Sequence, residues 1–166
     1  SYKVFPQPLA QVVKAQSGTN ADINCLIAGC LREMGYTVEP VMIKLRSSGL
    51  LLEHQPEMHP YDTFILKVTA SDGTSYYLDG GSDDAYINVL SPLMLVEKAR
   101  VLRPERMSQW VDLTRLGRNG TIMSVKASVA PDMTLSGTVS SKFSGQDSYS
   151  IKRDYNSFDD EDGFIE

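Results

Sequence analysis

The chain has 166 residues, of which 42% are hydrophobic, and it carries a formal net charge of −5. This length suits one domain, or one domain with a small appendage; two cysteines make no disulfide framework, and no apolar run approaches the ~18 residues of a membrane span. Six acids and no base follow Arg153, which leaves 16 bases and 15 acids in the first 153 residues, and this balance argues against a nucleic-acid surface.

The first residues predict an extended segment and a short helix. They lack the basic and apolar regions of a signal peptide and also lack a methionine, so we expect a processed or cut chain. Residues 1–8 are expected to be extended because Pro6 and Pro8 oppose an early helix, and residues 9–15 to form a short helix.

A longer buried helix, from about residue 20 to residue 34, carries the strongest local signal. Thr19 and Asp22 have the spacing of a capping box, and Gly35 can take the left-handed conformation that ends a helix. Apolar side chains recur at helical spacing and predict the buried face: Ile23, Leu26, Ile27, Cys30, Leu31 and Met34. Cys30 lies on this stripe and Cys25 lies off it, and both are expected to be inert core thiols.

The middle of the chain predicts strands and one long loop. A mostly apolar strand is expected at 37–45, followed by a loop at 46–62 that is long enough to cover or complete a site. A hairpin is expected from strands at 64–68 and 75–79, with Asp-Gly at the centre of its turn. A short helix at 93–98 and a short strand at 100–102 follow.

Past Pro104 the pattern becomes β-like. We expect β-segments at 110–113, 121–128, 133–143 and 148–152, and the alternation of polar and apolar residues after Thr121 is typical of strands with one solvated face. The prediction is therefore an α+β fold, with a buried N-terminal helix packed on an antiparallel sheet (residues 1–104) and a small β-rich C-terminal segment (residues 105–166).

The acidic tail after Arg153 is expected to be solvated, because like charges repel and hold such a segment open. The alternative is a calcium site formed by Asp159, Asp160, Glu161 and Asp162, although these residues lack the spacing of an EF-hand loop. We therefore expect neither a metal site nor a cofactor.

Three runs in order, SGTNADINCLIAGCLREMGYTVEPVMI, HPYDTFILKV and YYLDGG, resemble the core of the transglutaminase-like (papain-related) superfamily. The likeness covers about residues 10–103 and looks closest to bacterial envelope proteins in which such a core sits between β-rich domains. It rests on a loop that opens a helix, a strand, a second strand start and a strand that ends in Leu-Asp. In active members, the resemblance implies cysteine acyl transfer or amide hydrolysis, with a thiolate, a histidine base and an orienting aspartate.

Carried over residue by residue, the nucleophile position falls on Asn20, the base position on Thr63 and the aspartate position on Asp79. An amide is no thiol and threonine is no base at neutral pH, so the resemblance implies a member without catalysis. It also implies a residual cleft, in which we place Asn20, Asp62, Thr63 and Asp79 as candidate ligand-binding residues. Independently of the resemblance, Asp79 can cap the Gly80-Gly81 turn through its side chain.

Two function classes follow. The first is a catalytically inactive transglutaminase-like module with a binding or scaffolding role at the bacterial cell envelope, by resemblance in the periplasm. Its partner would be a protein or peptide, or other domains of a larger chain whose fold this piece completes, with no nucleic acid. The alternative is an active cysteine amidase or acyltransferase that uses Cys25 with His54 or His59 from the long loop; a zinc site from the same three residues lacks paired ligand spacing.

Overall fold

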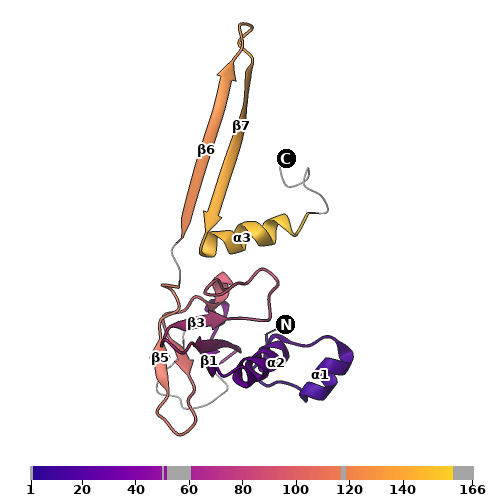
Figure 1. Ribbon diagram of the computed structural model, residues 1–166, viewed down its shortest axis with the longest axis vertical. Coiled ribbons are helices and arrows are strands. Elements are labelled where there is room, and N and C mark those ends of the chain that lie inside the picture. The colour runs from indigo at the N-terminus through magenta and orange to yellow at the C-terminus, as the bar shows by residue number, and fades with distance from the viewer. Residues whose placement is uncertain (1, 50, 52–60, 117–118, 159–166) are drawn as a thin grey trace. The chain divides into compact units, whose positions relative to one another are not determined.

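A computed structural model describes residues 2–49, 51, 61–116 and 119–158. The chain divides into two compact units, Ser1–Leu116 and Gly117–Glu166 (Figure 1). Among the described residues, the elements are three α-helices, a five-stranded antiparallel sheet and a two-stranded sheet. The predicted α+β class, with an N-terminal helix packed on an antiparallel sheet, is confirmed.

The sheet of the first unit has the strand order β3-β2-β1-β4-β5. Its strands are β1 (Thr37–Ile43), β2 (Thr63–Thr69), β3 (Ser75–Leu78), β4 (Ala99–Val101) and β5 (Gln109–Val111). Every pairing is antiparallel. Strands β2 and β3 form the predicted hairpin, whose turn contains Gly73 at φ +83°, a conformation that favours glycine.

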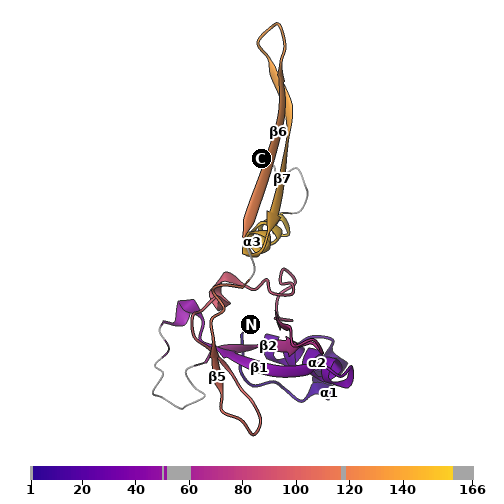
Figure 2. The same cartoon turned by 60° about the vertical axis from the view of Figure 1, so that its left-hand side comes forward.

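Two helices precede the sheet, α1 (Leu9–Ala15) and α2 (Asn20–Glu33). Helix α2 lies against β1 and β2, and α1 lies against α2 (Figures 1 and 2). The predicted capping box is present: Asp22 N donates to Thr19 Oγ1 (3.4 Å), and Thr19 N donates to Asp22 Oδ2 (2.7 Å). Gly35, at φ +88°, follows the end of the helix as expected.

The buried face of α2 differs from the predicted stripe. Its fully buried residues include Ala21, Asn24 and Ala28, whereas Met34 is 69% exposed. Cys25 is partly buried and packs on the core, while Cys30 is exposed, which reverses the order expected for the two cysteines. The reason is steric, because small side chains allow a helix to approach a sheet closely and larger ones then flank the contact.

The sheet separates two apolar clusters. On the helix side, Ala21 and Ala28 of α2 pack with Val38, Met42 and Phe64. A second cluster gathers side chains from β1, β2 and β4 with residues of the following loops: Val41, Ile43, Ile65, Leu90, Met94, Val101 and Leu113. The connection from β3 to β4 contains a short 3-10 helix, η2 (Pro92–Met94), where a helix at 93–98 was expected.

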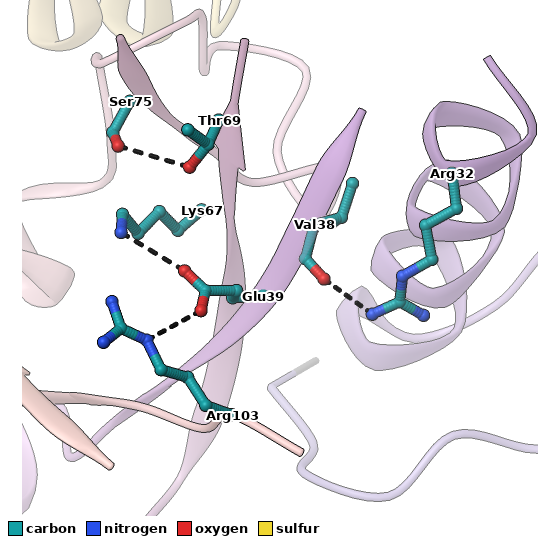
Figure 3. A network of polar contacts seen from close by, with 7 residues as sticks. All are labelled: Arg32, Val38, Glu39, Lys67, Thr69, Ser75 and Arg103. Atoms are coloured by element: carbon teal, nitrogen blue, oxygen red, sulfur yellow. Dashed lines mark hydrogen bonds and ion pairs between the residues drawn. The ribbon is translucent and has the colours of Figure 1, made fainter. Parts of the chain in front are cut away.

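A polar network ties the sheet together (Figure 3). Glu39 on β1 accepts from Lys67 Nζ on β2 (3.2 Å) and from Arg103 Nε after β4 (2.7 Å). At the end of α2, Arg32 Nη2 donates to the carbonyl oxygen of Val38 (2.7 Å). The network therefore fixes three segments around β1, because Glu39 joins two strands and the segment after a third.

The second unit contains β6 (Gly120–Val129), β7 (Leu135–Ser144) and α3 (Gln146–Tyr155). The two β-segments were predicted, but residues 148–152 are helical rather than extended. Alternating serines and apolar residues favoured a strand there, whereas Asp147 in the first turn and Lys152 in the last turn complement the helix dipole.

The boundary between the units also falls later than expected, after Leu116 rather than near residue 104. Strand β5 pairs with β4, with Trp110 opposite Arg100, and therefore belongs to the first unit. The Arg100 guanidinium lies 5.5 Å from the centre of the Trp110 ring. Across the described ranges, no helix has both the length and the apolar character needed to cross a membrane.

Candidate functional site

Asn20, Thr63 and Asp79 are brought close to the start of α2 although they are far apart in sequence. Asn20 is the first residue of α2, Thr63 is the first residue of β2, and Asp79 directly follows β3. All three are buried, with 4%, 0% and 7% of their surface exposed. The Asn20 side-chain amide donates directly to the Thr63 hydroxyl, so the first two residues form a bonded pair.

Asn24, one helical turn beyond Asn20, bonds both Asp79 and the residue that follows Thr63. Its Nδ2 donates to Asp79 Oδ1 (3.1 Å) and to the Phe64 carbonyl oxygen (2.9 Å), and its Oδ1 accepts from Gly80 N (2.8 Å). The sequence interpretation missed Asn24. A detectable signal was its amide within a helix expected to be buried, because buried polar groups need partners.

The Asn24 amide lies where β2 and β3 separate. The ladder between these strands ends at the pair Leu66 and Leu78. If the register continued, Phe64 would face Gly80, and the side chain of Asn24 joins the backbone groups of these two residues instead. A buried amide thus replaces two ladder contacts and fixes the hairpin to the helix.

Gly80 and Gly81 allow the turn after β3 to lie directly on α2. A Cβ atom on Gly80 would lie 2.8 Å from Ile23 Cγ2 and closer still to Ile27 Cδ1. A Cβ on Gly81 would lie 3.1 Å from the Cα of Asn20. Both glycines are therefore required for close approach, and any side chain here would push the turn from the helix.

Asp79 performs the predicted turn-capping role, since its Oδ1 accepts from Gly81 N (3.0 Å). Its second oxygen, Oδ2, is buried with no hydrogen-bond partner in the described part of the chain. Burial raises the pKa of this carboxyl, against the opposing effects of the Asn24 amide and the Gly81 N–H. The side chain therefore favours the protonated form more than an ordinary aspartate does.

The N-terminal segment closes the other side of the pair. Lys3 N donates to Asn20 Oδ1 (2.7 Å), and Gln7 N donates to Asp22 Oδ1 (2.6 Å). The Gln7 and Thr19 backbone N–H groups lower the pKa of Asp22, which holds it as a carboxylate. Both ends of the Asn20 amide are thus bonded within the chain, which leaves a sealed polar cluster at this position.

The expected residual cleft does not coincide with either of two pockets formed by the described residues. Neither of the two pockets described below is lined by Asn20, Thr63 or Asp79. Asp62 points elsewhere, because its Oδ2 accepts from Leu45 N (2.8 Å) and its N–H donates to the Ile43 carbonyl. It therefore connects the end of β1 to the start of β2, and most of the 46–62 loop lies outside the described residues.

One pocket, of about 270 Å³, lies between α2, the sheet and the N-terminal segment and includes Cys25, Arg32 and Phe64 in its lining. Burial and the charge of Asp22 raise the pKa of the Cys25 thiol, and Arg32 only partly opposes them. A thiol with a raised pKa is a poor nucleophile near neutral pH. The other pocket, of about 650 Å³, includes Lys44, Arg46 and Lys98 in its lining.

His54 and His59, the histidines of the alternative cysteine chemistry, lie outside the described residues, and so do Asp159, Asp160, Glu161 and Asp162. Within the described ranges, no group of three or more His, Cys, Asp or Glu side chains is arranged to hold a metal ion. No protein-family model, curated protein or solved structure matches the chain.

Proposed function

We propose that the first unit is a non-catalytic transglutaminase-like module that serves in binding or scaffolding at a bacterial cell envelope. The transglutaminase-like assignment and the envelope location rest on the order of the three sequence runs described above. The observation that carries the absence of catalysis is the direct bond between Asn20 and Thr63. These are the positions at which the resemblance would put a nucleophile and its base.

Chemistry explains why this pair would not support acyl transfer. The transfer needs a group that can attack as an anion and a neighbouring group that takes its proton. The Asn20 amide has no ionisable thiol, and a threonine hydroxyl accepts no proton at neutral pH. The pair instead satisfies its own hydrogen bonds, with Lys3 N on the remaining amide oxygen.

The orphan oxygen of Asp79 supports the same proposal. An aspartate that orients a histidine would bond the imidazole N–H, and a chain with threonine in place of that histidine would leave a carboxyl oxygen without this partner. Asp79 Oδ2 is such an oxygen. Burial raises the pKa of this carboxyl, because the protein interior disfavours its charged form.

The proposal can be tested by rebuilding the missing groups. In a background with Cys25→Ser and Cys30→Ser, Asn20→Cys would be compared with Asn20→Cys plus Thr63→His. Thiol modification by iodoacetamide at pH 6.5 should be at least about tenfold faster in the double variant, because an imidazole lowers the pKa of a neighbouring thiol. Asn20→Cys plus Thr63→Val is the matched control, since valine has the size of threonine and no base.

Two results would overturn the proposal. One is equal reactivity of the histidine and valine variants, provided that both retain the native circular dichroism spectrum. The other is turnover of a peptide amide by the unaltered chain that disappears in Cys25→Ser, which would favour the alternative cysteine enzyme.

A further inference from the structure

The hairpin of the second unit has two chemically different faces. Residues that are directly opposite in an antiparallel pair project from the same face, and the register pairs Val125 with Val139 and Ala127 with Gly137. One face therefore carries mostly apolar or small residues, together with Thr121, Ser141 and Phe143. We name the apolar and small residues of its central part the apolar hairpin face: Met123, Val125, Ala127, Val129, Leu135, Gly137 and Val139. Its outline follows directly from the register.

The opposite face is polar except for Ile122, which is 68% exposed. The register pairs Ser124 with Ser140 and Lys126 with Thr138, and Ser128 Oγ lies 3.2 Å from Ser136 Oγ. Serine and threonine side chains can form hydrogen bonds with water, so this face can remain solvated. The two faces thus have the pattern of a sheet with one side solvated and the other covered.

Among residues 119–158, no segment covers the apolar hairpin face along most of its length. Five of its side chains are between 62% and 68% exposed: Met123, Val125, Val129, Leu135 and Val139. Helix α3 begins directly after β7 and lies at the base of the hairpin (Figure 1), where Gln146 N donates to Asn119 Oδ1 (2.8 Å). A two-stranded sheet alone is at best marginally stable in water. Burial of the apolar hairpin face against another surface would therefore stabilise the hairpin.

We infer that the apolar hairpin face is a self-association surface, covered by the same face of a second copy of this chain. The face carries no charge, so two copies meet without repulsion, whereas Lys126 and Lys142 on the other face would repel their counterparts. Five side chains of this size, about 65% exposed, give roughly 500 Å² per copy, or about 1,000 Å² for a facing pair, which reaches the lower limit of a specific interface.

The shape of the face suits a twofold arrangement. Ala127 and Gly137 form a low pair next to the bulkier pair of Val125 and Val139. We place a twofold axis between the two facing sheets, perpendicular to the strands and midway between these two pairs. This axis puts the bulky pair of one copy over the low pair of the other. Such a contact is isologous and closed, so it stops at two copies.

The test compares neighbouring substitutions on the two faces in the full chain. The unaltered chain should sediment as a dimer at micromolar concentration. Val125→Lys should raise the dimer dissociation constant at least about 100-fold, since each copy would bury an unpaired charge. The matched control, Ser124→Lys, adds the same charge one residue away on the solvated face and should leave the dimer intact.

Val139→Lys and Ser140→Lys repeat the comparison on β7. Because Val125 and Val139 are exposed in the single chain, these lysines should leave its circular dichroism spectrum unchanged. A chain that stays monomeric at about 100 µM, well above the roughly micromolar dissociation constant expected here, would overturn the inference. Equal weakening by the valine and serine variants, or binding to phosphatidylcholine vesicles without self-association, would also overturn it.

Discussion

Asn24→Ala should be among the most damaging single changes in the first unit. Asn24 has none of its surface exposed and makes three hydrogen bonds, to Phe64 O, Asp79 Oδ1 and Gly80 N. Removing the amide takes a partner from two backbone groups and from one Asp79 carboxyl oxygen. Each loss costs about 1 kcal/mol or more, so the free energy of unfolding should fall by about 3–4 kcal/mol.

Urea denaturation followed by tryptophan fluorescence measures this loss. Trp110 is the only tryptophan and lies on β5, so its signal reports on the first unit alone. At an ordinary urea dependence, the midpoint should fall by about 2 M. Asn24→Asp keeps the volume and the acceptor for Gly80 N but loses both donors, so it should be comparably destabilising at neutral pH.

Gly29→Ala is the control in the same helix. Gly29 is exposed, and a Cβ there would meet nothing within 4 Å, so alanine should stabilise α2 by about 0.5–1 kcal/mol. If Asn24→Ala and Asn24→Asp each cost less than about 1 kcal/mol, the amide does not hold the diverging strands to the helix and the reasoning fails.

Three further outcomes are expected. Burial raises the pKa of Asp79 above its ordinary 3.8, so this carboxyl keeps its proton to a higher pH in the native state than in the unfolded state. The free energy of unfolding should therefore fall as pH rises from 3.8 through the raised pKa. In Asp79→Asn, the urea midpoint should not show this fall. Gly80→Ala should cost about 1–3 kcal/mol through its clash with Ile23, measured by the same fluorescence; a neutral effect would refute the close contact. In mass-spectrometric labelling at pH 8, exposed Cys30 should react well before Cys25, and the reverse order would contradict the raised pKa of the Cys25 thiol.

Local signals predicted several elements well because their interactions lie within a few residues. The capping box of Thr19 and Asp22 sets the start of α2, and the Asp-Gly turn sets the β2–β3 hairpin, with Thr74 N donating to Asp72 Oδ1 (2.8 Å). The alternation after Thr121 predicted the extended conformation of β6, although residues on both faces of that strand are exposed rather than on one. Each of these features depends on hydrogen bonds or side-chain spacing within a short segment.

Other features were decided by contacts between distant segments. Residues 146–155 form a helix rather than the predicted strand. In the folded second unit Gln146 and Tyr149 are buried, and this burial depends on the rest of the unit rather than on neighbouring residues. Likewise, β5 joined the first unit because β4 offered it a free edge, although Pro104 lies between them in sequence.

The sequence by itself determined where α2 begins and ends and where the β2–β3 hairpin turns. It also determined that the residues aligned by resemblance with a nucleophile and a base are an asparagine and a threonine. Only the tertiary structure decided which face of α2 is buried and that Asn24 links Phe64, Asp79 and Gly80. The physical reason is that caps and turns depend on neighbouring backbone groups, whereas packing depends on how closely the helix can approach the sheet, which the small residues of α2 and the glycines after β3 permit.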